Sequence, residues 1–263
     1  MTSMTWALKR QIFYVLIVVA FISIFGFLII YPSFKKAPTC SDGRQNGNET
    51  GVDCGGLCAR ACVAEVQDPS VLWARAFKVI PGRYNAVAYI VNHNENAASQ
   101  KVNYRFRFGD INNIYIGKRE GSTFVPPGGN FAVFEPGIDI GNSIPVYVTF
   151  EFTEKPIWFQ VSEDRKEQLK IAVSNILLSG ETTSPRLSAT LKNNSIFNIP
   201  NVSTVAIIYD EKGNAISTSR TFLNQLLPDK NTDINFTWPE ALPGVPVAKE
   251  IIPMFDILSV KLK

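Results

Sequence analysis

The alternation of a half-buried β-strand is clearest in one stretch, Val102-Asn-Tyr-Arg-Phe-Arg-Phe108. Successive side chains of a strand point to opposite faces, so Val102, Tyr104, Phe106 and Phe108 share one apolar face. The composition agrees, because 18 Phe, 8 Tyr, 17 Gly and 16 Pro accompany 46% hydrophobic residues overall. Such a composition is typical of strands joined by turns. We therefore expect mostly β structure.

An internal repeat extends this expectation to most of the chain. Asn92 and Asn193 each follow an apolar strand and lie 101 residues apart. The same offset relates Pro127 to Pro228, Pro145-Val146 to Pro246-Val247, and the strand quoted above to Ser203–Tyr209. A constant offset held over some fifty residues indicates a tandem duplication.

The duplication predicts the fold class: all-β, with two tandem immunoglobulin-like β-sandwiches. Their expected bounds are residues 65–155 and 168–263, with a polar linker at 156–167. Each copy has about 90 residues of short strands and turns, as in such sandwiches. That length suffices for folding alone, so we expect two independent folding units, with Phe106 and Ile207 in matching core sites.

The turns of the second copy carry a family resemblance. The strand Ile207-Ile208-Tyr209 runs into a turn from Asp210 to Gly213, and Leu227-Pro228-Asp229 follows the next strand. This resembles the FxLYD-type family of immunoglobulin-like modules, which have a Tyr-Asp-x-x-Gly turn and a Leu-x-Pro-Gly loop. Asp229 stands where the family has Gly, and Phe108-Gly109-Asp110 of the first copy stands where it has Tyr-Asp, although Pro126-Pro127-Gly128 fits the loop. The resemblance implies a fold and no activity, since β-sandwiches host many functions.

A run of about twenty uncharged residues, from Ile12 to Tyr31, precedes the repeat. At 1.5 Å per residue it matches a hydrocarbon core of about 30 Å, so we expect a transmembrane signal-anchor helix at 12–31. A cleaved signal peptide is the alternative. Its apolar region is normally about 7–15 residues and ends in a small-residue cleavage site, which Leu28–Pro32 lacks.

Four cysteines follow the apolar run and set the orientation of the chain: Cys40, Cys54, Cys58 and Cys62. Cysteines in such a cluster suit an oxidising compartment. Flanking charge gives no orientation, because two cations lie on each side of the run. We therefore expect residues 1–11 in the cytoplasm and residues 32–263 outside, in a single-pass membrane protein.

The segment 32–64, here called the neck, has too few apolar residues to build a core. Two disulfides should hold it, in any of three possible pairings. A four-thiolate zinc site is the alternative, but 13, 3 and 3 intervening residues are not zinc-ribbon spacing. The stretch Cys40–Cys62 resembles a Cys-rich motif of bacterial secreted and surface proteins, CxDGxxNGxETxVDCGGxCxxC, although Cys58 and Cys62 enclose three residues instead of two. That resemblance implies a location outside the cytoplasm and a linker role.

The neck also carries oxygen ligands on a Gly-punctuated loop: Asp42, Asn46, Asn48, Glu49 and Asp53. Hard oxygens on a flexible turn suit Ca²⁺, the one cofactor that the sequence suggests. The alternative is a structural role, since Asp and Asn side chains accept hydrogen bonds from nearby backbone N–H groups in turns.

Patterns of catalysis are missing from the sequence. His93 is the single histidine and lies in a polar strand end, where a solvated loop residue is expected. No nucleophile elbow, zinc-protease motif or phosphate-binding loop occurs. Two carboxylate pairs, Glu163 with Asp164 and Asp210 with Glu211, are expected in exposed turns. Three aromatic side chains, Tyr84, Tyr115 and Trp158, are expected to point outward.

The charge distribution and this search together indicate a function class. Net charge is +3, but four cations precede Asp42 and leave −1 for the rest, so bulk charge does not favour nucleic acid. We expect a protein that is not an enzyme, anchored in the membrane and working by adhesion or by scaffolding other envelope or surface proteins. The alternative is an accessory subunit of a membrane secretion or pilus-type assembly. An envelope hydrolase is disfavoured.

Overall fold

The structure is a computed structural model that describes residues 6–34 and 39–262. Residues 1–5, 35–38 and 263, which belong to the predicted N-terminus, neck and second copy, lie outside the described residues. The helices are α1 (Trp6–Phe34), a 3-10 turn (Val63–Glu65) and α2 (Glu163–Gln168). The strands are β1 (Ser70–Ile80), β2 (Arg83–Asn92), β3 (Ala97–Gly109), β4 (Tyr115–Val125), β5 (Gly129–Asp139), β6 (Tyr147–Phe152), β7 (Phe159–Gln160), β8 (Ile171–Ser179), β9 (Arg186–Asn193), β10 (Ile199–Tyr209), β11 (Ala215–Leu226), β12 (Asn231–Thr237) and β13 (Ala248–Met254).

Both copies are antiparallel β-sandwiches, which confirms the predicted fold class. In module 1 (β1 to β7) one sheet has the order β1-β2-β5 and the other β4-β3-β6, with β7 paired to β3. In module 2 (β8 to β13) the orders are β8-β9-β12 and β11-β10-β13. Strand by strand the two topologies are the same, with β8 in the place of β1 and β13 in the place of β6.

The alternating stretch Val102–Phe108 belongs to β3, which lies in the middle of its sheet between β4 and β6. Phe106 and Phe108 are at most 2% exposed, whereas Arg105 and Arg107 on the other face form ion pairs at the surface. The Phe106 ring meets Phe150 of β6 edge to face, with centroids 4.9 Å apart. The alternation in the sequence therefore identifies the core face.

The duplication is visible in two buried asparagines. Asn92 Nδ2 donates to the Pro126 carbonyl at 2.7 Å, and Asn193 Nδ2 donates to the Leu226 carbonyl at 2.9 Å. Each amide thus ties the end of β2 or β9 to the end of β4 or β11, just before the loop that leads to β5 or β12. Both side chains are at most 1% exposed, so these bonds satisfy amides that would otherwise be costly to bury.

The turn after the buried asparagine is one residue shorter in module 2. Asn92 Nδ2 also donates to the carbonyl of Ala97, five residues on, whereas Asn193 Nδ2 donates to Phe197, four residues on. Residues of β10 are therefore offset by 100 from β3. The offset is still 100 at Tyr115 and Ala215, and it returns to 101 in the loop before β5 and β12, where Gly128 and Asp229 both have positive φ, +59° and +50°.

The predicted match of Phe106 with Ile207 is wrong for this reason. Phe106 pairs with Phe150 of β6, and Ala206 pairs with Ile251, the counterpart of Phe150 in β13. Ala206 belongs to the core of module 2. Ile207 lies on the opposite face of β10 and is buried in a cluster with module 1.

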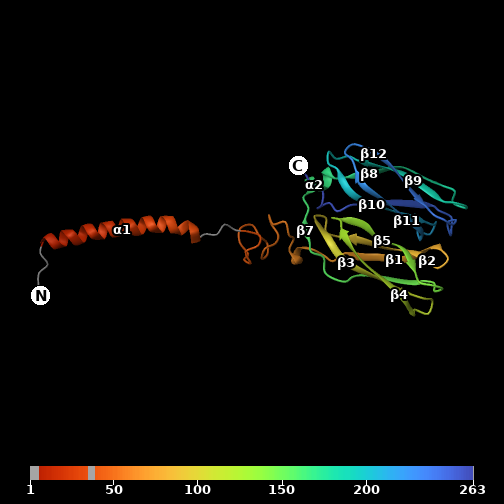
Figure 1. Ribbon diagram of the computed structural model, residues 1–263, viewed down its shortest axis with the longest axis horizontal. Coiled ribbons are helices and arrows are strands. Elements are labelled where there is room, and N and C mark those ends of the chain that lie inside the picture. Colours follow the sequence, from red (N-terminus) through yellow and green to blue (C-terminus); the bar gives the residue numbers. More distant parts are fainter. Residues whose placement is uncertain (1–5, 35–38, 263) are drawn as a thin grey trace.

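The two modules pack through a broad interface. Sheet β11-β10-β13 lies against sheet β1-β2-β5, so four sheets follow one another from β8-β9-β12 at the top of Figure 1 to β4-β3-β6 at the bottom. One buried cluster joins Val87, Tyr89 and Phe134 of module 1 to Val205 and Ile207 of module 2. Module 2 also has a core of its own between its two sheets, and independent folding of the copies stays a prediction.

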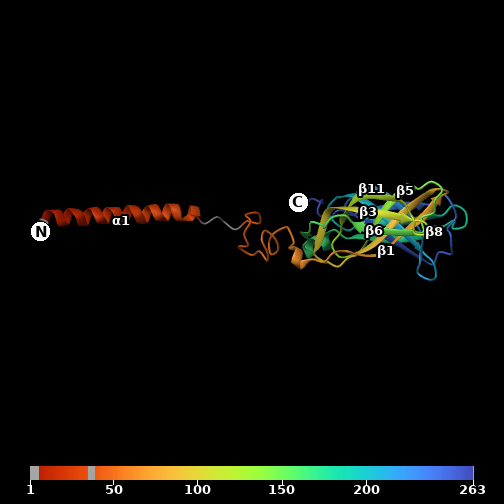
Figure 2. The same ribbon diagram turned by 90° about the horizontal axis from the view of Figure 1, so that it is seen from below.

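The neck is attached to module 1 by backbone pairing. Ala61 N donates to the Trp158 carbonyl at 3.0 Å, and Gln160 N of β7 donates to the Ala59 carbonyl at 2.7 Å. Trp158 is 4% exposed and belongs to the cluster that joins the modules. The predicted linker therefore runs through packed structure, and both views show the neck and α2 at the same end of the sandwiches (Figures 1 and 2).

Helix α2 fastens the linker to the end of module 2. Ser162 caps the helix, its Oγ accepting a hydrogen bond from Arg165 N at 3.3 Å. The Arg165 guanidinium donates to the carbonyl oxygens of Ile257 (2.7 and 2.9 Å) and Val260. One cation thereby satisfies carbonyl groups of the irregular segment after β13.

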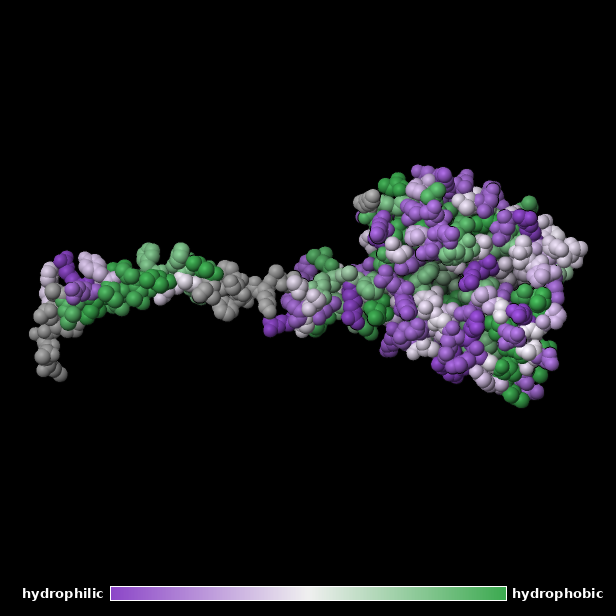
Figure 3. All heavy atoms as spheres, viewed as in Figure 1, coloured by the Kyte–Doolittle hydropathy of each residue, from purple (hydrophilic) through white to green (hydrophobic). Residues whose placement is uncertain are grey.

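Helix α1 contains the predicted membrane segment. The window Arg10–Ile29 has a mean hydropathy of 3.0, and none of it is buried. Figure 3 shows its apolar surface along most of its length. By length and composition the helix can cross a membrane, as an anchor or as a signal sequence.

Candidate functional site

The four neck cysteines form two disulfides, as predicted. Cys40 is bonded to Cys58 and Cys54 to Cys62, and the described residues contain no free cysteine. The zinc alternative needs thiolates, and these sulfurs are bonded to one another. Cys58 and Cys62 are at most 5% exposed, so the bridges form the centre of a segment with almost no core.

The predicted calcium ligands Asp53, Glu49 and Asp42 are engaged with the loop itself. Asp53 accepts hydrogen bonds from the backbone N–H groups of Asp42 (2.9 Å) and Gly43 (3.0 Å). Glu49 Oε2 accepts from the N–H groups of Asn46 and Asp53, both at 3.3 Å. Asp42 accepts from the Asn46 side-chain amide at 2.9 Å, a bond that lowers the pKa of this carboxyl group.

These contacts favour the structural alternative for the five residues. Asn46 Oδ1 is buried without a hydrogen-bond partner in the described part of the chain, but Ca²⁺ takes about six to eight oxygens. The exposed Asn48 acts through its backbone: Gly56 has a φ of +57°, and a Cβ there would lie 1.6 Å from the Asn48 carbonyl oxygen. Tight turns therefore account for the ligand-like residues, and calcium stays a prediction.

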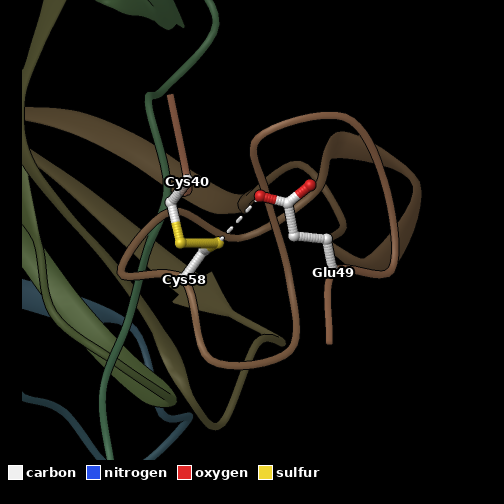
Figure 4. A group of neighbouring side chains, drawn as sticks. All are labelled: Cys40, Glu49 and Cys58. Atoms are coloured by element: carbon white, nitrogen blue, oxygen red, sulfur yellow. Dashed lines mark hydrogen bonds between the residues drawn. A yellow bond between two sulfur atoms is a disulfide. The ribbon is translucent and has the colours of Figure 1, made fainter. Parts of the chain in front are cut away.

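One group of side chains resembles a metal site in composition (Figure 4). Glu49 Oε1 lies 3.4 Å from Cys58 Sγ, beside the Cys40 sulfur. Both sulfurs belong to one disulfide, so they carry no proton to donate and no thiolate charge to hold a cation. The group is a packing contact of the neck.

A polar centre lies inside the interface between the modules. Tyr89 of β2 and Tyr209 of β10 each donate a hydroxyl hydrogen bond to the Glu250 carboxylate, both at 2.7 Å. Asn130 of β5 donates to the Tyr89 hydroxyl at 2.9 Å. Burial, together with Glu250, raises the pKa of Tyr89 to about 12 and raises that of Tyr209 as well. These bonds fix the relative position of the sheets, because they need specific partners on both sides.

An open groove of about 570 Å³ lies where module 1, α2 and module 2 meet. Its walls include Pro127 of module 1, Lys166 of α2, and Met254 and Phe255 of module 2. Lys166 Nζ is engaged with the Glu95 carbonyl at 3.0 Å and with Glu163 at 2.9 Å. Lys170, which also lines the groove, is paired with Glu167, so both cations of the groove are already engaged.

His93 lies beside a hydroxyl that the sequence analysis did not pair with it. Its Nε2 is 3.0 Å from Ser70 Oγ, where Ser70 begins β1 and pairs with Val91 of β2. Both residues are exposed, and no carboxylate of the described residues is recorded on the imidazole. A solvated pair without an orienting acid lacks the third member of a nucleophilic triad.

The two predicted carboxylate pairs lie at turns and helix ends. Glu163 and Asp164 form the first turn of α2, where negative charge is favourable. Asp210 Oδ1 accepts from the backbone N–H of Lys212 (2.9 Å) and Asn214 (2.8 Å), and these bonds, chiefly that of Asn214, lower its pKa. Both pairs serve local structure.

Two of the three aromatics expected to point outward are buried. Tyr84 is 8% and Trp158 is 4% exposed, Tyr84 because it lies on the core face of β2 and Trp158 because the neck covers it. Tyr115 is 60% exposed, as expected. It is part of a larger exposed apolar group whose members lie far apart in the sequence.

This group, here called the tip patch, lies at the end of module 1 opposite the neck. It combines the β3–β4 turn, the β5–β6 loop and the adjoining strand ends. Its six members are 45–67% exposed: Ile111, Ile114, Tyr115, Ile144, Val146 and Tyr147. Figure 3 shows apolar atoms gathered at the lower right, where Figure 1 places this end of β4. No single segment of the sequence reveals the patch, because its members come from a turn and a separate loop.

Comparison with known proteins adds little to this geometry. The chain matches no family model, so its resemblance to FxLYD-type modules stays a prediction, and it matches no curated protein. Two similar solved structures are red sea bream transglutaminase and a beta-glucuronidase from glycoside hydrolase family 2. The first has 10% identity and a TM-score of 0.25, covering 72% of this chain and 29% of that one. The second has 9% identity and a TM-score of 0.25, covering 86% and 28%. The chain thus spans less than a third of either protein, at a similarity too low to carry an argument.

Proposed function

We propose that this chain is a non-catalytic, membrane-anchored protein of the cell envelope that acts by adhesion or scaffolding. Helix α1 would hold it in the membrane, with residues 32–263 outside. The supporting observation is that neck and modules form one continuously packed body, from the Ala61–Trp158 bond to the Tyr89–Glu250–Tyr209 centre. A rigid body suits a protein that must hold a partner at a set position.

The anchor and the disulfides support the proposed orientation together. Helix α1 offers an unburied apolar window of 20 residues, about 30 Å long. Two disulfides follow the helix, with all four cysteines between Cys40 and Cys62, and such bonds persist in oxidising compartments. The cytoplasm would then hold the N-terminal end of α1.

Partner binding is assigned to the end of the modules that lies away from the neck. Strand β3 has 13 residues and runs from the neck end to the tip patch, a distance of about 43 Å at 3.3 Å per residue. Loops held at the end of rigid sandwiches are common binding elements. The tip patch is the apolar part of this end.

The experiment places a photo-crosslinking amino acid at Tyr115 in the full chain in intact cells. The matched control carries it at Phe222 of β11 in module 2, an aromatic residue that is 55% exposed against 60% for Tyr115. The proposal expects one discrete crosslinked envelope component, protein or lipid, at Tyr115. No product above the control, or full protection of the modules from protease added outside the membrane, would refute it.

A further inference from the structure

The tip patch continues into an ordered series of side-chain rows on the outer face of sheet β4-β3-β6. The first row is Tyr115 and Tyr147, which pair with Gly109 from either side. Beyond it, at the very end of the module, lie the aliphatic side chains Ile111, Ile114, Ile144 and Val146. The Tyr rings therefore separate an aliphatic end from the rest of the sheet.

The second and third rows are charged. Arg107 pairs in register with Lys118 of β4 and Thr149 of β6, two residues behind the Tyr row. Arg105 follows with Glu120 and Glu151. Three cations share two carboxylates in this network, so the rows keep a net positive charge. Lys118 and Arg107 side chains are 52% and 53% exposed.

Module 2 is only partly apolar at the corresponding end, where Val245 and Val247 are exposed in the places of Ile144 and Val146. Its β10–β11 turn is polar, with Glu211 and Asn214 in the register positions of Ile111 and Ile114. Ala215 and Ala248 stand in the places of Tyr115 and Tyr147. The same topology forms with a polar β10–β11 turn, so folding does not require apolar side chains at Ile111 and Ile114.

From these rows we infer that the tip patch binds the surface of a lipid bilayer with anionic headgroups. Aliphatic side chains suit the acyl region, Tyr suits the interface, and cations suit the phosphate level. The cation row lies about 7 Å behind the Tyr row, two residues along a strand. One headgroup layer is about 5–8 Å thick, so the spacing fits.

The shape of the patch favours a bilayer over a protein partner. Its side chains project from loops at the end of the module, and the groove described above is lined by other residues. Protruding apolar groups enter a fluid interface without a matching cavity. A protein partner would instead need a pocket shaped to these side chains.

The position of the patch suggests which membrane it meets. It lies at the opposite end of module 1 from the neck, so the bilayer that it binds would face the membrane that holds α1. This last point rests on the proposed function. Binding of the patch to lipid does not, and it can be measured without the anchor.

The test uses residues 39–263, because both core clusters begin at Ala61 or later and both disulfides lie within Cys40–Cys62. Binding is measured by flotation with vesicles of phosphatidylcholine plus phosphatidylglycerol and with vesicles of phosphatidylcholine alone. The main variant is Ile111→Glu, Ile114→Asn and Tyr115→Ala, the residues that module 2 carries. The control removes three equally exposed apolar side chains elsewhere: Ile196→Glu, Leu177→Asn and Phe222→Ala.

We expect the unchanged protein and the control to bind the mixed vesicles equally well, and the main variant to bind them with an affinity lower by about tenfold or more. Arg107→Gln with Lys118→Gln should remove the preference for phosphatidylglycerol and its salt dependence. Two results would overturn the inference: no binding of the unchanged protein to either vesicle, or equal binding by the main variant. Crosslinking at Tyr115 to a protein, without vesicle binding, would leave the proposed function standing and assign the patch to a protein.

Discussion

Ile207 and Ile208 of β10 are neighbours of the same type on opposite faces, which makes them a matched pair for testing the interface. Both are fully buried. Ile207 belongs to the cluster shared with module 1, and Ile208 to the core of module 2. Changing either to Ala removes three carbons, about 0.8 kcal/mol each, and leaves a cavity, so either change should cost about 2–5 kcal/mol.

The two substitutions should differ in where that free energy is lost. Ile207→Ala removes packing between the modules, so amide exchange should accelerate in β1, β2 and β5 as well as in β10. Ile208→Ala removes packing within module 2, so the acceleration should fall on β8, β9 and β12. Hydrogen exchange followed by mass spectrometry on residues 39–263 resolves these segments.

Calorimetry provides an independent readout of the same pair. With the interface intact we expect one cooperative transition, and Ile207→Ala should separate it into two. Ile208→Ala should lower the melting temperature without such a separation. Equal exchange patterns for the two variants, with β1, β2 and β5 unaffected by either, would show that the interface contributes nothing to stability.

Three further outcomes follow from the structure. Mass spectrometry should show four alkylated cysteines only after reduction, and alkylation without reduction would contradict the pairing. Removing the Cys54–Cys62 bridge by Cys54→Ser with Cys62→Ser should destabilise the neck by about 2–3 kcal/mol, which would appear as faster proteolysis before Val63. The pKa of Tyr89 is about 12 in the folded protein and about 10 in the unfolded chain, so this tyrosine contributes stability below pH 10 that is lost as the pH rises towards 12. Over that range the melting temperature should fall less steeply with pH in the double variant Tyr89→Phe with Tyr209→Phe than in the unchanged protein, and parallel slopes would refute this. Gly128→Ala should lower the free energy of unfolding by more than about 1 kcal/mol, because φ is +59° and a Cβ would lie 2.7 Å from Glu95 Oε2. Asp229→Gly, at the equivalent position of module 2, should change it by less than about 1 kcal/mol, and chemical denaturation can measure both changes.

The predictions from sequence succeeded where one local pattern determined the structure. Alternation in Val102–Phe108 identified the core face, since a strand with one solvated face must alternate. Asn92 and Asn193 marked equivalent strand ends, because a buried amide that bonds two loops is hard to replace. The cysteines predicted two disulfides, but the spacing alone could not choose the pairing.

The failures came from distance and register. One residue fewer after Asn193 moved the match of Phe106 from Ile207 to Ala206. The change is reversed in the loop before β5 and β12, so residues on either side of it keep the constant offset that conceals it. The tip patch joins a turn and a loop about 30 residues apart, so no window of sequence contains it. Trp158 was expected outside because nothing in the sequence places the neck on top of it.

A signal for the interface was nevertheless present in the sequence. Strand β3 alternates, but its counterpart β10 contains the unbroken apolar run Val205-Ala-Ile-Ile208, and β2 contains Ala86-Val-Ala-Tyr-Ile90. A continuous apolar run is typical of a strand buried on both faces. An isolated sandwich covers only one face of each sheet, so two such runs in successive copies require something to cover the second face. In this chain each copy covers the other, and module 1 is left with its β4-β3-β6 face, its rows of charge and its apolar tip turned outward.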